Sequence, residues 1–188
     1  NISDRASAGV YADTPGQARR TVLAAGATPL RPRRLQQDSL LDTDDESLRQ
    51  LRCVLRIRRD GSTSILTYKG PVQPGPMKLR EEFETAAADG DMLRAIFDRL
   101  GLRAWFRYEK YREEFTAEGV IVAVDETPVG TFVEIEGTSD GITAMAAAMG
   151  KGPGDFILDS YYRLFMKTRE ALGFRGHDMV FDDPGRTQ

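Results

Sequence analysis

The chain has 188 residues, of which 40% are hydrophobic and 29% are charged, and its formal net charge is −3. This composition is ordinary for one soluble globular domain, and the negative net charge argues against a nucleic acid held by general positive charge. The single cysteine, Cys53, and the single histidine, His177, exclude internal disulfides, Cys/His zinc clusters and Ser-His-Asp catalysis. No segment has the character of a membrane span or a signal peptide, so we expect a cytoplasmic protein.

The first fifty residues predict a strand, a helix and a second strand. Thr14 followed by Pro15 is typical of a helix start, and Gly26 is typical of a helix stop. The basic segment after this helix reads as a connector. The expected elements are a strand within residues 1–12, a helix over residues 14–26, a connector over residues 29–34, a strand over residues 35–42 and a polar turn or short helix over residues 44–49.

Residues 51–71 predict a β-hairpin, with its turn at Asp60-Gly61-Ser62. Side chains alternate between the two faces of a strand, so Arg56 and Arg58 are expected on one face and apolar side chains on the other. Lys69 lies nearby on the return strand. The hairpin therefore combines one apolar face with a face that carries two guanidinium groups, close to an ammonium group.

The rest of the chain predicts further hairpins and helices. The expected elements are strands over residues 80–86, 105–115, 120–125 and 131–137, and helices over residues 89–100, 139–150 and 155–172, the last capped by Asp155. The glycine-rich residues 150–154 read as a linker, because they lack the spacing of a phosphate loop and follow a helix. About eight strands, mostly in hairpins, favour an antiparallel α+β barrel over a doubly wound sheet. We expect one domain over residues 1–175 and a loose C-terminal tail over residues 176–188.

Charged side chains share one face of three other predicted strands as well. These are Arg80, Glu82 and Glu84 on one strand, Asp125 on another, and Glu134 and Glu136 on a third. One interpretation is the solvated face of an ordinary antiparallel sheet. The other is a closed sheet with a charged interior, whose basic side chains bind a polyanion and whose carboxylates hold a divalent metal.

Several short segments, taken together, resemble the CYTH family of triphosphate tunnel enzymes. The matching segments are Leu55-Arg56-Ile57-Arg58, Leu66-Thr67-Tyr68-Lys69-Gly70-Pro71, Arg80-Glu81-Glu82-Phe83-Glu84, Lys110-Tyr111-Arg112, Asp125-Glu126, Gly130-Thr131-Phe132-Val133-Glu134-Ile135-Glu136 and Ser160-Tyr161. They follow the order of the family and cover most of the chain. The resemblance implies a closed eight-stranded antiparallel barrel, with helices outside, that holds a triphosphate and Mg²⁺ or Mn²⁺. It also implies a small-molecule triphosphate as the partner. From the net charge and the lack of a membrane span we expect no nucleic-acid or membrane partner, and we expect a monomer or a homodimer.

The same resemblance assigns roles to these residues. Catalytic and phosphate-binding roles fall to Arg56, Arg58, Lys69, Lys110 and Arg112. Arg80 joins the substrate-binding set, in which Glu82 and Glu84 balance or orient the basic side chains. The implied metal ligands are Asp125, Glu134 and Glu136. The implied activity is that of a phosphohydrolase for inorganic or small organic triphosphates, or of a class IV adenylyl cyclase.

The N-terminal strand departs from the family pattern. The family opens with Glu-x-Glu-x-Lys, which supplies metal ligands and a phosphate-binding lysine, and counting back from Thr14 places these positions near Asp4, Ala6 and Ala8. The alternative to an enzyme is therefore a module that binds a polyphosphate or a nucleotide without cleaving it. An ordinary α+β barrel with a solvated charged face is the third hypothesis.

Overall fold

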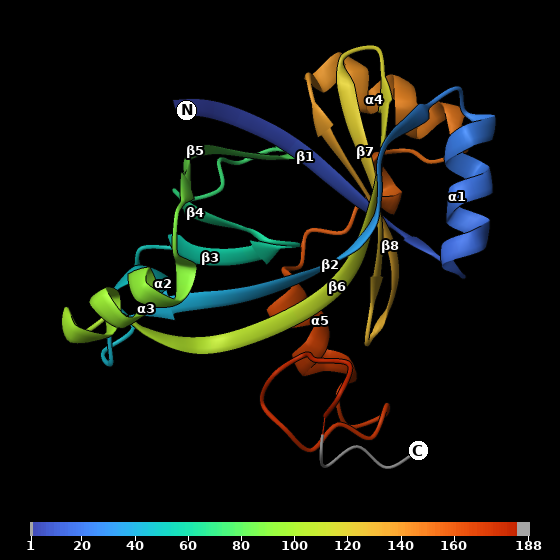
Figure 1. The fold of residues 1–188 in the computed structure, drawn as a ribbon. Helices are drawn as coiled ribbons and strands as arrows, with labels where there is room; N and C mark the ends of the chain where they lie inside the picture. The colour runs from blue at the N-terminus through green and yellow to red at the C-terminus, as the bar shows by residue number, and fades with distance from the viewer. Residues whose placement is uncertain (1, 184–188) are drawn as a thin grey trace.

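Eight antiparallel strands close into a barrel in a computed structural model that describes residues 2–183, with side chains from residue 5 onward (Figure 1). Around the barrel the order is β1, β5, β4, β3, β2, β6, β7, β8. The strands are β1 (Ile2–Ala12), β2 (Thr28–Asp42), β3 (Val54–Asp60), β4 (Thr63–Lys69), β5 (Lys78–Ala87), β6 (Arg103–Ala117), β7 (Val120–Thr127) and β8 (Gly130–Gly137). The predicted closed eight-stranded barrel of the α+β class is confirmed.

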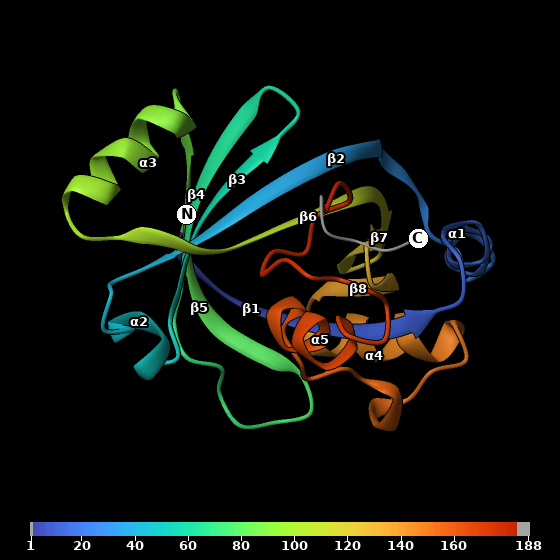
Figure 2. The same ribbon diagram turned by 90° about the horizontal axis from the view of Figure 1, so that it is seen from below.

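The helices lie outside the strands, on different sides of the barrel (Figures 1 and 2). They are α1 (Pro15–Ala24), α2 (Ser47–Gln50), α3 (Gly90–Arg99), α4 (Ser139–Ala148), the 3₁₀ helix η1 (Pro153–Asp155) and α5 (Tyr161–Thr168). Helices α1 and α4 contact β1, β7 and β8, whereas α3 contacts β3, β4 and β6 on the other side. Among the described residues, no helix combines the length and the hydrophobicity needed to cross a membrane.

The main hydrophobic core lies between α1, α4 and the outer faces of β1, β7 and β8. The alternating valines of β7 and the apolar side chains of β8 belong to this core, together with Ile142 and Met145 of α4. Because successive residues of a strand point to opposite faces, burial of this set on the outer side directs the intervening charged residues into the barrel. The alternation of apolar and charged residues along these strands thus determines which side chains line the tunnel.

The second strand begins earlier than the sequence predicted. Residues 29–34 form the first part of β2 instead of a connector, and Arg34 pairs in register with Arg112 of β6. The prolines in this segment indicated a break, but the β2–β6 pairing has register shifts here, between Pro29 and Arg31 and between Arg31 and Arg34. Proline is tolerated in sheets at such irregular places.

The C-terminal part of the chain also differs from the prediction. Helix α5 begins at Tyr161, and the side chain of Ser160, rather than Asp155, caps it by accepting a hydrogen bond from the backbone N–H of Arg163 at 3.2 Å. The segment after α5 is held against the barrel: Met179 is fully buried and exchanges backbone hydrogen bonds of 3.0 and 2.8 Å with Arg107 and Glu109. Isolated apolar residues such as Met179 give no periodic signal, which explains why this contact was not predicted.

Candidate functional site

Strands β3, β4 and β5 place the predicted phosphate-binding residues on the same wall of the tunnel. Arg56 pairs in register with Thr67, Thr67 with Glu84, and Lys69 with Glu82. Directly opposed residues of antiparallel strands share a face, so these side chains meet inside the barrel. Lys69 forms an ion pair with Glu82 at 3.3 Å, and Thr67 donates a hydrogen bond to Glu84 at 3.0 Å. Glu82 and Glu84 thus each contact a polar side chain of β4 on this wall.

Arg58 is held by the carboxylate of Asp38, which was not predicted as a site residue. Its Nε and Nη2 atoms each donate to one oxygen of Asp38 at 2.8 Å, and both side chains are buried. Burial alone would raise the pKa of Asp38, but Arg58 outweighs this effect and the pKa lies far below its usual range. Gln36 and Asp38 are two residues apart in a predicted strand, so they share one polar face. This spacing could have predicted that Asp38 lies on the charged side of the sheet.

Strand β6 brings Lys110 and Arg112 to Asp125 of β7. Lys110 Nζ lies 3.1 Å from Asp125, both oxygens of which accept 2.7 Å hydrogen bonds from Arg112. The hydroxyl of Tyr161, at the start of α5, donates to the same carboxylate at 2.7 Å. Arg112 also reaches Glu134 at 3.1 Å. Asp125 is therefore the anchor of the basic side chains on this wall.

The basic side chains of the tunnel are close enough to disfavour one another's charge. Burial and the neighbouring Arg56 lower the pKa of Lys69 to about 8. Burial and Arg112 lower the pKa of Lys110 to about 8, although Asp125 acts in the opposite direction. A tunnel that keeps mutually repelling cations in a buried wall is suited to bind an anion, which would relieve this repulsion.

Arg56 carries the least compensated of these charges. Its side chain is buried, its Nη2 atom donates to Thr67 at 3.5 Å, and its Nε atom has no hydrogen-bond partner among the described residues. Arg80 donates to two backbone carbonyls, those of Gly70 at 2.7 Å and Arg52 at 3.4 Å. A buried donor without a partner is costly, so Arg56 marks the place where a ligand would be stabilised most.

The tunnel-facing positions of β1 differ from those inferred from the sequence. Ala6 and Ala8 belong to the hydrophobic core outside the barrel, whereas Arg5, Ser7 and Gly9 face the tunnel. A shift of one residue turns every side chain of a strand to the other face. The predicted alignment was therefore wrong by one position at Ala6 and Ala8. The backbone of Asp4 pairs with Glu81, but the Asp4 side chain lies outside the described residues.

Among the described side chains of β1, Arg5 is the charged one that faces the tunnel. Its Nη1 atom lies 3.0 Å from Glu136 and 3.8 Å from Glu82. Burial would lower the pKa of Arg5, but Glu136 outweighs it, so the guanidinium stays charged. Arg5 was not predicted as a site residue, although Ala6, Ala8 and Val10 alternate as an apolar face and thereby place Arg5 on the opposite face.

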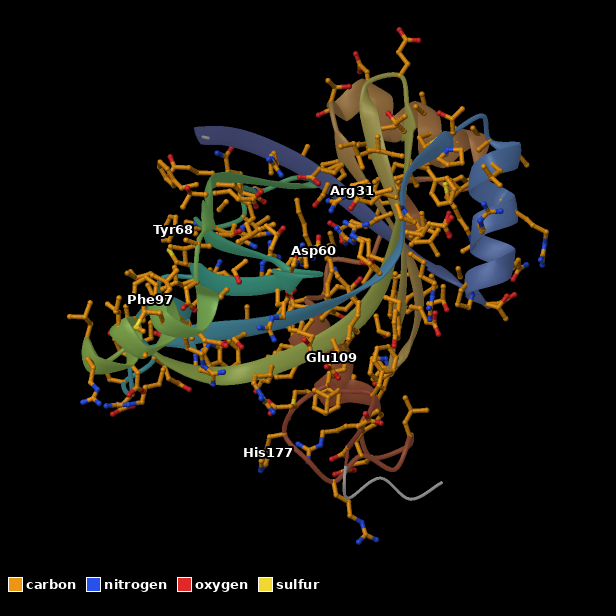
Figure 3. The ribbon with its side chains drawn as sticks, viewed as in Figure 1. Arg31, Asp60, Tyr68, Phe97, Glu109 and His177 are labelled. Atoms are coloured by element: carbon orange, nitrogen blue, oxygen red, sulfur yellow. The ribbon has the colours of Figure 1, made fainter. Side chains whose placement is uncertain are left out.

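A second ionic cluster lines the tunnel between β2, β3 and β6. Arg34 binds Asp60 at 2.9 Å and also contacts Glu114, and Gln36 donates to Asp60 at 2.9 Å. Figure 3 shows Arg31 and Asp60 in the space enclosed by the strands, and their charged groups lie 3.8 Å apart. Figure 3 also places His177 on the C-terminal segment, away from this cluster.

The carboxylates of the tunnel do not form a ready-made site for the expected divalent ion. Within the described part of the chain, no three Asp, Glu, His or Cys side chains are grouped so that they could hold a metal. Asp125 already accepts from three donors, Glu134 is bound by Arg112 and Glu136 by Arg5. A resident metal would have to displace these cations, so the residues present do not fit it.

Comparisons with known proteins agree with this architecture. The CYTH domain family matches residues 11–151. A protein from Methanocaldococcus jannaschii that is named as a candidate adenylate cyclase is 31% identical over 105 residues, which cover 55% of this chain and 60% of that relative. The match thus spans less than two thirds of the relative's own length.

Three solved structures share the fold. A Pyrococcus horikoshii protein is 26% identical with a TM-score of 0.73, and the alignment covers 88% of this chain and 99% of that one. A candidate adenylate cyclase from Vibrio parahaemolyticus has a TM-score of 0.74 at 15% identity, covering 87% and 98% of the two chains. A candidate adenylyl cyclase from Hippeastrum, described as having a dominant triphosphatase activity, has a TM-score of 0.66 at 18% identity, covering 87% and 95%. The family match over most of the sequence and the closed barrel together show that this chain belongs to the CYTH domain family.

Proposed function

We propose that the tunnel binds inorganic triphosphate, or the triphosphate of a small organic molecule, and catalyses its cleavage. The observation that carries this proposal is the buried group of mutually repelling cations, in which Arg56 has a donor without a partner among the described residues. Membership of the CYTH domain family supports a triphosphate as the anion, and the names of the relatives support an enzyme. Hydrolysis is preferred to cyclisation, because no described feature marks an adenine pocket.

The phosphate-binding set in this proposal comes from four strands. It comprises Arg56 and Arg58 of β3, Lys69 of β4, Arg80 of β5, and Lys110 and Arg112 of β6. Forked guanidinium donors suit phosphate oxygens, and they would stabilise the charge that develops during cleavage. Glu82 and Glu84 hold Lys69 and Thr67 in place. Most of the catalytic effect would come from positioning and from charge stabilisation.

Mg²⁺ or Mn²⁺ remains the proposed cofactor for cleavage, and it would join the phosphates of the substrate once they lie in the tunnel. Mg²⁺ is usually held by one or two carboxylates together with substrate phosphates, so a preformed cage is not required. Glu134 and Glu136 are the better candidates of the three predicted ligands, because each side chain is about one third exposed, at 32% and 29%, whereas Asp125 is fully buried.

A binding module without catalysis is the second candidate function. The observation that favours it is the tunnel-facing side of β1, which presents Arg5, Ser7 and Gly9 and thus offers no carboxylate at these positions. Such a protein would bind a polyphosphate or a nucleotide and release it unchanged.

The test of the proposed function is phosphate release from inorganic triphosphate with Mg²⁺ or Mn²⁺, beside chromatography of an ATP reaction for cyclic AMP. We expect metal-stimulated phosphate release and no cyclic AMP. Cyclic AMP would move the assignment to a cyclase. Tight binding of triphosphate without any product would favour the binding module, and an absence of binding would contradict both candidate functions.

Triphosphate affinity is expected to fall as the pH rises above 8. Lys69 and Lys110 have pKa values of about 8, so both are charged at lower pH and lose their protons above it. The charged form binds the anion, and the dissociation constant should therefore rise by up to about tenfold per pH unit for each lysine. Calorimetric titrations between about pH 7 and pH 10 measure this slope. Lys69→Arg stays charged throughout, so it should have the shallower slope, and an unchanged slope would contradict the role of Lys69.

A further inference from the structure

Arg5 lies in the tunnel wall between two carboxylates from neighbouring strands, one of which, Glu136, has no other ion-pair partner among the described residues, while the other, Glu82, also pairs with Lys69. It projects from β1 between Glu136 of β8 and Glu82 of β5. We propose that Arg5 acts as a built-in counter-ion in place of a divalent metal, so that the tunnel binds the metal-free triphosphate anion. This inference rests on the proposed function and concerns how the substrate is bound, whereas the metal proposed above concerns its cleavage.

The geometry supports a counter-ion role for Arg5. Its Nη1 atom lies 3.0 Å from Glu136 and 3.8 Å from Glu82, so a single charged group serves both carboxylates. The Glu82 side chain is only 9% exposed, which limits how far water can screen it. Without a nearby cation these carboxylates would repel an incoming triphosphate. A divalent ion could remove this repulsion, but Arg5 already does so with a charge that proteins do not deprotonate.

The rest of the tunnel supports the same conclusion. Asp38 is held by Arg58, Asp125 by Lys110 and Arg112, and Glu134 by Arg112. The described residues include no group of three carboxylate, imidazole or thiol side chains arranged for a metal. Arg56, by contrast, forms no ion pair among them. The anionic groups are thus neutralised by fixed side chains, and the cationic excess is available to the phosphates.

Isothermal titration of the full chain with inorganic triphosphate, once in excess EDTA and once in excess Mn²⁺, tests the inference. We expect the two dissociation constants to agree within about threefold, because arginine supplies the charge in both. Arg5→Gln should weaken binding in EDTA by about tenfold or more, since a hydrogen-bonded charge is lost, and Mn²⁺ should restore part of that loss. A purely structural role of Arg5 would weaken binding equally in both solutions.

Arg19→Gln is the matched control. Arg19 of α1 also forms one 3.0 Å ion pair, with Glu113, but it lies on the outer helix and not in the tunnel. Its loss should leave both constants unchanged. Circular dichroism and urea unfolding of each variant confirm that it is folded.

Titration with Mn²⁺ alone gives an independent readout. The wild-type chain should bind no stoichiometric Mn²⁺, whereas Arg5→Glu, which places a third carboxylate beside Glu82 and Glu136, should gain such binding. If the wild-type chain binds Mn²⁺ without phosphate, or binds triphosphate at least about tenfold more weakly in EDTA, the inference is overturned while the proposed function stands. If triphosphate binds in neither solution, the proposed function fails as well.

Discussion

Replacing Arg56 with glutamine is expected to weaken triphosphate binding by about a hundredfold while leaving the fold intact. A hydrogen bond from a guanidinium to a charged acceptor contributes about 1.5–3 kcal/mol, so losing two of them at the lower end of that range corresponds to this factor. The fold should tolerate the change, because Arg56 forms no ion pair among the described residues and its Nε atom already lacks a partner there. Calorimetric titration with inorganic triphosphate measures the loss.

Arg59→Gln is the matched control for this prediction. Arg59 lies on the same strand as Arg56, three residues further on, but it is on the outer face and its side chain is 61% exposed. The affinity of the Arg59→Gln variant for triphosphate should equal that of the wild type. If Arg56→Gln changes the affinity for triphosphate only slightly, the proposal that Arg56 binds the phosphates is contradicted. Arg58 is less suitable for such a test, because its loss would leave Asp38 buried without its partner and would confuse binding with folding.

Replacing Asp125 with asparagine is expected to lower the free energy of unfolding by about 3–5 kcal/mol, the usual cost of removing one member of a buried ion pair. Asp125 is fully buried and compensates both Lys110 and Arg112, and asparagine keeps the shape of the side chain but removes its charge. Urea unfolding monitored by circular dichroism measures the change. A loss below about 1 kcal/mol would show that the two cations find other partners.

Triphosphate itself provides a further test of the same variant. If the anion binds these cations, saturating triphosphate should stabilise the wild-type chain and should recover part of the stability that Asp125→Asn loses, because ligand binding to the native state adds to stability. The exposed Asp13, which precedes α1, supplies the control. Asp13→Asn should change neither the stability nor the response to triphosphate.

The sequence was sufficient for the parts of this protein that depend on local periodicity. The two-residue alternation of β3, β7 and β8 assigned Arg56, Asp125 and Glu134 to the faces on which the structure places them. The turn at Gly61 and the helix cap at Thr14 follow from local backbone chemistry, which neighbouring residues decide. The closed barrel itself was expected from the family resemblance of several separate segments, which no single segment would have indicated.

Only the tertiary structure decided which charges neutralise one another. Arg58 of β3 binds Asp38 of β2, and Arg5 of the first strand binds Glu136 of the last strand. These pairs depend on how strands remote in the chain align when the barrel closes. A register shift of a single residue exchanges the two faces, which is why Ala6 was assigned to the tunnel and Arg5 was overlooked. Each strand's own sequence determines which side chains face the tunnel. Contacts between strands that are remote in the chain determine which carboxylates are paired with arginine or lysine, and therefore which charges are left to bind phosphate or a metal.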